Sequence, residues 1–311
     1  MIIVLGSINI DMLMQVKHFP KPGETVLTHA YEWMPGGKGM NQAVAAARAG
    51  GKVAMIGKVG DDGFGTRALN SMRREGILTT AVTVSEDTPT GCATIFVDET
   101  GENQIVVAQG ANSEVSPEQV PDEILTPGNV VLMQMELPEA VNWDVLARAS
   151  ARGAKTILNL APAHALPREA LDHLDYLIVN RIEAEQIAAR LKLKIESDAA
   201  KLAHALSRQC DLTCIITLSS KGSVAVHGNK GWYVPALGVQ PVVDTTGAGD
   251  AYCGVFAEAI HRRLSVPEAM RRASLAGSMS VTAKGAQTAM PYADDIANGL
   301  HQIPDAEELT I

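Results

Sequence analysis

A short segment in the last third of the chain combines small residues with carboxylates. Residues 242–250 read VVDTTGAGD and precede a stretch with apolar residues at helical spacing, which predicts a strand end, a glycine turn and a helix. Gly247, Ala248 and Gly249 let the backbone approach a ligand, and successive N–H groups at a helix N-terminus bind an anion such as a phosphoryl group. Asp250 then lies in the first helical turn, where a carboxylate can accept a proton from an attacking hydroxyl. The alternative is an ordinary helix start with an acidic residue favoured by the helix dipole.

A second glycine cluster stands much earlier in the chain. Residues 35–41 read PGGKGMN and open an Ala-rich segment with helical periodicity. Close backbone approach together with Lys38 and Asn41 would recognise a polyhydroxylated or phosphorylated ligand. A flexible loop followed by a helix start is the alternative interpretation.

Other nucleotide and metal motifs are missing. The sequence holds no G-x-x-x-x-G-K-[ST], and after Gly247 and Gly249 the third glycine of G-x-G-x-x-G is replaced by Tyr252. HExxH, CxxC and GxSxG are also absent, and the eight histidines are scattered. The four cysteines of so long a chain form no disulfide framework. These absences argue against a P-loop, a standard dinucleotide site and a zinc protease. Without a dinucleotide site, a dehydrogenase is also unsupported.

The composition limits the class of partner. The chain has 311 residues, 46% of them apolar, and 26 Lys and Arg against 35 Asp and Glu give a formal charge of −9. This balance provides no electrostatic attraction to nucleic acid or an anionic membrane. The sequence starts directly with an apolar strand pattern, without a basic leader or a spanning segment. We therefore expect a soluble, cytoplasmic protein that binds neither nucleic acid nor membranes.

Apolar β-branched runs alternate with amphipathic helical stretches along most of the chain. The expected strands are 2–8, 52–58, 129–135, 155–160, 175–180 and 214–218. The expected helices include 42–49, 66–75, 143–151 and 199–209. This pattern predicts an α/β fold, a doubly wound, mostly parallel, Rossmann-like sheet with helices on both faces.

Two stretches break this alternation. Residues of about 12–34 and 91–110 alternate apolar and polar side chains around turn residues, which predicts antiparallel hairpins. We expect the hairpins to join as a small antiparallel β lid over a ligand site, on a single domain of residues 1–311; two unrelated edge hairpins are the alternative. The acidic tail after Pro304 is expected to be frayed.

The two glycine motifs, in this order and with both hairpins in the first third, resemble the ribokinase family of ATP-dependent carbohydrate kinases, the PfkB group. Four further segments resemble this family, namely Asn9–Asp11, the sequence GENQIVVAQGAN, Met133–Glu136 and the sequence KGAQ near the end. The resemblance therefore covers essentially the whole chain. It implies a ribokinase-like fold and transfer of phosphate from ATP to D-ribose, giving D-ribose 5-phosphate and ADP. A nucleoside, 2-deoxyribose or a ketose as substrate, and a non-catalytic sugar-binding protein, are the alternatives.

The resemblance also assigns roles to residues. Asp250 would be the general base, with Gly247, Ala248 and Gly249 as the anion hole. The sugar-binding positions, which also include Asp250, are Asn9, Asp11, Gly37, Lys38, Gly39, Asn41 and Glu136. The ATP-binding positions, which also include Gly249 and Asp250, are Asn180, Thr217, Leu218, Ser219, Ser220, Lys221 and Gly222.

Cations and a partner copy follow from the same resemblance. Glu183 would organise the waters of Mg²⁺. Potassium would be the activating monovalent cation, at Asp244, Thr246, Ser280, Ala283, Gly285 and Ala289. Met40 and Cys253 depart from the family pattern near the expected sugar site, and Ala273 and Ser274 stand where an adenine-contacting Asn or His is common. The exposed lid strands predict a homodimer.

Overall fold

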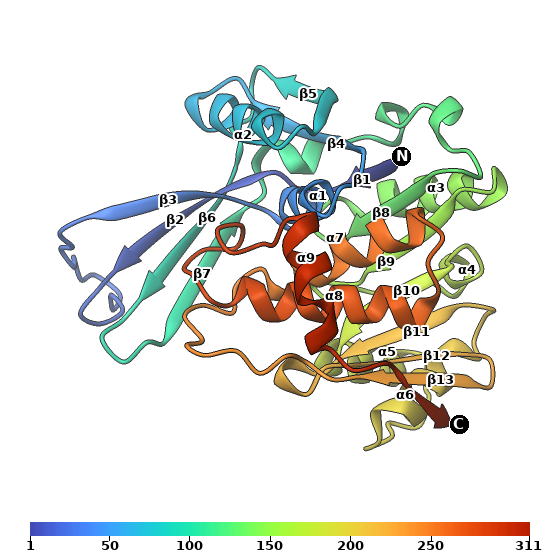
Figure 1. The fold of residues 1–311 in the computed structure, drawn as a ribbon. Coiled ribbons are helices and arrows are strands. Elements are labelled where there is room, and N and C mark those ends of the chain that lie inside the picture. Colours follow the sequence, from blue (N-terminus) through green and yellow to red (C-terminus); the bar gives the residue numbers. More distant parts are fainter.

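A ten-stranded sheet forms the centre of the computed structural model, which describes residues 1–311 (Figure 1). In spatial order its strands are β14 (Glu307–Thr310), β13 (Lys230–Val234), β12 (Ser223–His227), β11 (Thr213–Thr217), β10 (Tyr176–Asn180), β9 (Lys155–Asn159), β8 (Val130–Gln134), β1 (Ile2–Leu5), β4 (Val53–Gly60) and β5 (Leu78–Ser85). The pairs from β5 to β11 are parallel, and β12, β13 and β14 continue the sheet in antiparallel pairs. The six predicted strands are confirmed, whereas β5, β12, β13 and β14 were not predicted.

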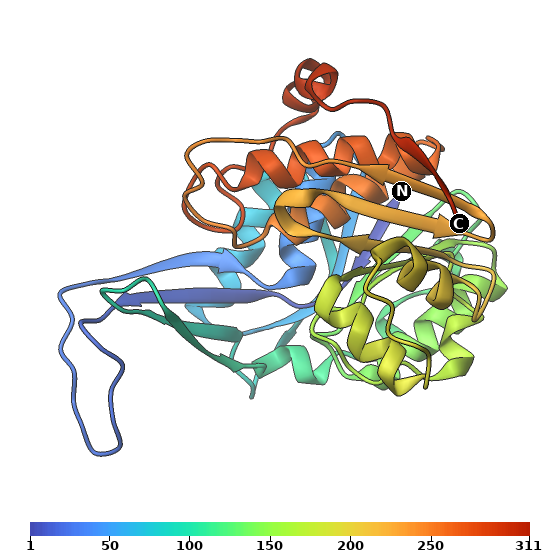
Figure 2. The same cartoon turned by 90° about the horizontal axis from the view of Figure 1, so that it is seen from below.

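Helices cover both faces of this sheet, as predicted. They are α1 (Lys38–Arg48), α2 (Gly63–Arg74), α3 (Glu139–Ala151), α4 (Arg168–Leu171), α5 (Arg181–Arg190), α6 (Ala199–Ser207), α7 (Ala248–His261), α8 (Val266–Ser280) and α9 (Ala293–Gly299). Strand β1 shows how the layers arise, because all four of its residues are buried. Ile2 and Val4 pack with α1, α2, α7, α8 and α9, while Ile3 and Leu5 pack with α3 to α6 on the other face. Figure 2 shows the two helix layers on opposite sides of the sheet.

A second sheet of four strands projects from the edge of the first (Figure 1). Its strands are, in order, β3 (Tyr31–Gly36), β2 (Asn9–Gln15), β6 (Gly91–Val97) and β7 (Asn103–Ala108). Each hairpin is antiparallel, and the central strands β2 and β6 join the two hairpins in parallel. The two hairpins therefore form one small sheet, as expected, which we call the lid sheet.

The acidic C-terminal tail is not frayed, and this expectation was wrong. Glu307–Thr310 pairs with β13, with Leu309 opposite Gly231. Leu309 and Ile311 pack against the core on the α3 to α6 side, while the intervening polar residue is exposed. Two apolar side chains at strand spacing and a set of backbone hydrogen bonds are enough to fix the tail at the sheet edge.

The order of the strands places a crevice at one end of the sheet. The chain continues from β1 to β4 on one side, and β8 later pairs with β1 on the other side. Ligands of open α/β sheets bind at such a switch point, outside the carboxyl ends of the strands. At this end lie Asp11 and Glu136, which follow β1 and β8, and Asn159 and Asn180, which are the last residues of β9 and β10. No helix of the structure combines the length and the apolar character needed to cross a bilayer.

Candidate active site

The start of α7 has a backbone conformation that requires glycine. Gly247 is the N-cap residue with φ of 80°, and a Cβ atom there would lie 2.6 Å from the carbonyl oxygen of Ala286. The Ala248 N–H donates to the Thr245 carbonyl at 3.3 Å. Gly249 has open space around its Cα, so that a ligand can approach the backbone there. The helix start thus has the free approach and the positive end that an anion needs.

Asp250 lies in the first turn of α7 and is 6% exposed. Its Oδ2 accepts a hydrogen bond from Asn41 Nδ2 at 3.0 Å, and its Oδ1 accepts one from Gln42 Nε2 at 2.9 Å. Both donors come from α1, the helix that the first glycine cluster opens. The two motifs that are more than 200 residues apart in sequence therefore meet at one carboxylate.

A cavity of about 230 Å³ lies against Asp250. Lys38, Asn159, Glu183, Gly247 and Cys253 are among its lining residues. The negative charge of Asp250, followed by that of Glu136, outweighs burial and raises the pKa of Lys38, whereas burial raises the pKa of Glu183. The lining of the cavity therefore holds one cation, Lys38, and two carboxylates, Asp250 and Glu183.

Asp11 and Glu136 approach the same region from the lid sheet and from the end of β8. Glu136 Oε2 accepts hydrogen bonds from Ser7 Oγ at 2.5 Å and from the Lys38 N–H at 2.9 Å. The Asp11 carboxylate lies where a Cβ of Gly36 would be, so that glycine is needed in the neighbouring strand. Burial, with the charges of Glu136 and Asp250, raises the pKa of Asp11 to about 7.

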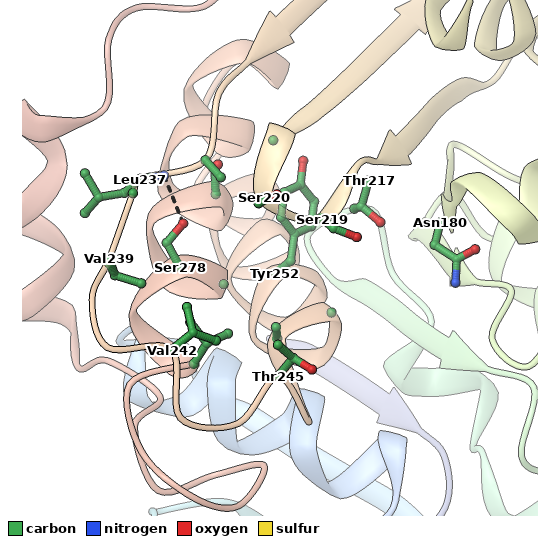
Figure 3. A pocket seen from close by; sticks show the side chains of 18 of the residues that line it. Asn180, Thr217, Ser219, Ser220, Leu237, Val239, Val242, Thr245, Tyr252 and Ser278 are labelled. Atoms are coloured by element: carbon green, nitrogen blue, oxygen red, sulfur yellow. Dashed lines mark hydrogen bonds between the residues drawn. The ribbon is translucent and has the colours of Figure 1, made fainter. Parts of the chain in front are cut away.

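A larger cavity, of about 690 Å³, lies on the other side of the α7 start (Figure 3). Four residues line both cavities, namely Asn180, Thr217, Thr245 and Gly249. The two cavities therefore meet at the proposed anion site. Beyond this junction the large cavity runs between the loop around Leu237 and α8, where Ser278 Oγ accepts the Leu237 N–H at 3.0 Å.

The predicted ATP-binding residues divide into two groups. Asn180, Thr217, Ser219, Ser220 and Gly222 line the large cavity. Three do not: Leu218 packs against the core, Lys221 is exposed, and Asp250 lines the small cavity instead.

Asn180 and Glu183, which are expected at ATP and at the magnesium waters, cap the start of α5. Asn180 Oδ1 accepts the Glu183 N–H at 2.9 Å, and Glu183 Oε2 accepts the Asn180 N–H at 2.7 Å. One oxygen of Glu183 thus serves the helix cap. Glu183 also lines the small cavity, where it can accept a hydrogen bond from water bound to a divalent cation.

The predicted monovalent-cation residues lie on the loop before α7, on the loop after α8 and at Ser280, the last residue of α8. Asp244 holds the two loops together. Its carboxylate accepts the N–H groups of Thr246 and Gly285, both at 2.9 Å. Burial raises its pKa, but these two hydrogen bonds outweigh that effect and the pKa is lowered. The Ser280 hydroxyl donates to the Gly277 carbonyl, and Ala283, Gly285 and Ala289 can offer only main-chain oxygens. This donor set suits a large, weakly hydrated cation.

Two residues expected in or near the sugar site, Met40 and Asn9, are buried. Met40 was expected near the sugar site, but it is fully buried in the core. It follows Lys38 by two residues, which places it about 200° around the helix from the side that faces the cavity. Asn9 is 4% exposed and its Oδ1 accepts from Asn112 Nδ2 at 2.7 Å, so that it holds the base of the lid sheet.

The remaining predicted positions lie at or beside the cavity. Gly37 has φ of 86°, and Gly39 packs so closely on Gly6 that a Cβ would lie 2.5 Å from the Gly6 carbonyl carbon. Cys253 lines the small cavity, is 1% exposed, and has a pKa raised by burial. It therefore behaves as a small apolar group rather than a reactive thiolate.

Three polar residues of the site were not predicted: Gln42, Gln134 and Asn159. Gln42 directly follows the first glycine motif, and Gln134 interrupts an otherwise apolar buried strand. A polar residue inside a strand that is covered on both faces is the signal that could have identified Gln134.

Comparison with known proteins gives consistent matches over most of the chain. The model of the family described as pfkB family carbohydrate kinase matches residues 1–293. A ribokinase of Bacillus subtilis is 38% identical over 95% of this chain and 97% of its own, and a deoxyribokinase of Salmonella typhi is 34% identical over 93% and 95%. The structure of an Arabidopsis thaliana ribokinase complexed with ribose and ATP superposes with a TM-score of 0.87 at 28% identity, covering 96% of this chain and 98% of that one.

Proposed function

Because the chain belongs to the pfkB family of carbohydrate kinases, an ATP-dependent group of enzymes, we propose that it transfers phosphate from ATP to the terminal hydroxyl of D-ribose. The observation that carries this proposal is the place of Asp250. Its carboxylate is held by two amide donors at the N-terminus of α7, where the two cavities meet. The B. subtilis and A. thaliana relatives support ribose as the sugar.

The sugar binds in this proposal between the lid sheet and the carboxyl ends of β1 and β8. Asp11 and Glu136 accept hydrogen bonds from sugar hydroxyls, and Lys38 donates to them. Asn41 completes this wall while it holds Asp250 and accepts Gln287 Nε2 at 2.9 Å. A sugar hydroxyl in the small cavity then lies next to the carboxylate of Asp250.

The chemical step needs a base and an anion site more than it needs covalent catalysis. Asp250 accepts the hydroxyl proton while the sugar oxygen bonds to the γ-phosphorus and the bond from phosphorus to the ADP oxygen breaks. The backbone amides at 247–249 stabilise the negative charge on the equatorial oxygens. The charge of Lys38 also lies beside this position.

Two cations complete the proposed site. A divalent cation accompanies ATP in this family, and we assign it as Mg²⁺, held through water by Glu183; it would neutralise the charge of the phosphates. Potassium would bind to the loops around Asp244 and Gly285, whose main-chain oxygens suit it. The chain's own contribution is the Asp244 carboxylate, which fixes the loop before α7 to the loop that packs on Gly247.

The lid sheet supports a proposed homodimer. Every residue of β7 is exposed, including Ile105, Val106 and Val107, and Tyr31 of β3 is 61% exposed. Such an apolar sheet with free edges pairs favourably with a second copy. Sedimentation should show a dimer that Val106→Glu dissociates, and a monomeric wild type would contradict the proposed dimer.

Four free cysteines fit a reducing compartment, so we place the protein in the cytoplasm.

The second candidate substrate is 2-deoxyribose. The deoxyribokinase of S. typhi is nearly as similar to this chain as the ribokinases are. Asp250 and the backbone amides of 247–249, which are assigned as base and anion site, would act in the same way on this sugar.

A substrate panel tests the proposed function. We expect ADP release from MgATP to be strong with D-ribose, weaker with 2-deoxyribose, and near background with fructose, fructose 6-phosphate and adenosine. Potassium should stimulate the turnover relative to sodium. Turnover confined to 2-deoxyribose would replace the substrate but keep the mechanism, whereas no turnover with any sugar would contradict the proposed function.

The affinity for the sugar should depend on pH through Asp11. Its pKa is raised to about 7, so that the group is neutral below this pH and an anion above it. The anion accepts hydroxyl hydrogen bonds more strongly, and the Kd for ribose should therefore rise as pH falls through about 7, by about tenfold per unit. Calorimetry on wild type and Asp11→Asn checks this, since the variant should bind weakly without that pH dependence. An equally pH-dependent variant would show that another group is responsible.

A further inference from the structure

Three buried amide side chains lie beneath the carboxylate of Asp250, and the proposed reaction uses only the contact that Gln42 makes with this carboxylate. Gln134 lies on β8, Gln42 on α1 and Asn159 at the end of β9; they are 0%, 0% and 8% exposed. Gln134 Nε2 donates to Gln42 Oε1 at 2.8 Å. Gln42 Nε2 donates to Asn159 Oδ1 at 3.0 Å and to Asp250 Oδ1 at 2.9 Å. The amides therefore form one chain of hydrogen bonds that ends on Asp250.

The backbone fixes the orientation of Gln42 within this chain. Asn159 Nδ2 donates to the carbonyl of Ile178 at 3.1 Å, which turns the Asn159 oxygen toward Gln42. The oxygen of Gln42 is occupied by Gln134. Since one end of an amide only donates and the other only accepts, the end of Gln42 that faces Asp250 must be the N–H end. The reverse orientation would place an oxygen against both the Asn159 oxygen and the carboxylate.

This orientation decides how Asp250 can react. Each of its oxygens receives one amide hydrogen, Oδ1 from Gln42 and Oδ2 from Asn41. Two neutral donors fix the plane of the carboxylate and stabilise its ionised form, which is the form that accepts a proton. The Gln42 nitrogen that faces Asp250 only donates, so that the amide chain takes no proton from Asp250.

We propose that Gln42 is a positioning residue for the reaction, whose side-chain amide holds Asp250 ionised and aligned toward the sugar hydroxyl. This inference rests on the proposed role of Asp250 as the base. It also explains why an amide is needed: a glutamate at this position would put a second carboxylate within hydrogen-bond distance of the first. Two such groups in a buried site cannot both ionise readily.

The isosteric variant Gln42→Glu tests this proposal through the pH dependence of kcat, followed from about pH 5 to pH 9. We expect the acidic limb of the profile to move up by about one pH unit or more, as a neighbouring carboxylate makes Asp250 harder to ionise. The Kd values for ribose and ATP should stay within about threefold at the alkaline plateau. An unmoved acidic limb in a folded variant would overturn the proposal.

Asn142→Asp is the matched control. Asn142 is also fully buried, and its Nδ2 donates at 2.8 Å to the main-chain carbonyl of Gln134, without contact to Asp250. The control adds a buried acid but leaves the donor to Asp250 in place, so that its acidic limb should coincide with that of wild type. An equal displacement in both variants would show a general effect of buried charge and overturn the proposal.

A second variant decides the matter if Gln42→Glu fails to fold. Gln42→Met keeps the approximate volume and removes the donor, and we expect kcat to fall about 10- to 100-fold at every pH with both Kd values retained. A kcat within twofold of wild type would overturn the proposal. Failure of the proposed function is distinguishable from this, because then the wild type would lack sugar kinase activity or Asp250→Asn would retain it.

Discussion

Asp250→Asn should lower kcat with ribose and MgATP by about 100- to 10,000-fold, the usual range for the loss of a general base. The substitution keeps the shape of the side chain but removes the acceptor for the sugar proton. Asn41 and Gln42 both donate to Asp250, and an amide can still accept one of these hydrogen bonds. The Kd values for ribose and ATP, measured by calorimetry, should therefore remain close to those of wild type.

A lowered kcat together with unchanged Kd values distinguishes a general base from a carboxylate with a purely structural role. A purely structural role would weaken ligand binding or the melting temperature together with turnover. Near-normal turnover in Asp250→Asn would contradict the assignment, and it would leave the ribose hydroxyl without a base, since Asp11 and Glu136 are assigned to hold other hydroxyls.

Gly247→Ala should lower kcat by about 100-fold or more, because the backbone that forms the anion site would have to move. The residue has φ of 80°, and a Cβ would lie 2.6 Å from the Ala286 oxygen and 2.7 Å from its Cα. Neither neighbour is a flexible side-chain end, so that the start of α7 or the 283–289 loop must shift. A misplaced donor to the transferring phosphoryl group costs about 100- to 1,000-fold in similar anion holes.

Gly76→Ala provides the matched control for the backbone strain. Gly76 has φ of 74°, but no atom lies within 4 Å of its would-be Cβ. It therefore carries the same unfavourable conformation without a clash, at the turn between α2 and β5. Steady-state kinetics should show near wild-type turnover for this variant. Equal losses in both variants would show that strain or instability, rather than displacement of the anion site, limits turnover.

The local part of the site could be predicted from the sequence, because short-range rules fix it. The glycine at position 247 needs a left-handed φ, and the helix that follows carries Asp250 in its first turn. The apolar runs predicted the central strands within a few residues, since strands covered on both faces have a distinctive pattern. The position of Asp11 could also be predicted, because this residue comes shortly after the first strand in the sequence.

The remaining features depend on contacts between distant segments. Strand β14 forms because β13 offers a free edge, which the tail sequence does not reveal. Met40 lies in the core although Lys38, two residues before it, lines the small cavity, because the helix turns Met40 to the other side. Gln42 and Asn159 come from different elements, and only their meeting under Asp250 shows that they act together.

The most direct test of the central claim is the identity of the product, followed by phosphorus NMR during turnover of wild-type protein with D-ribose, MgATP and potassium. We expect one new phosphomonoester, on the terminal oxygen of ribose, formed in equal amount with ADP and absent with Asp250→Asn. Release of inorganic phosphate in place of a sugar phosphate, or phosphate on another ribose oxygen, would contradict it.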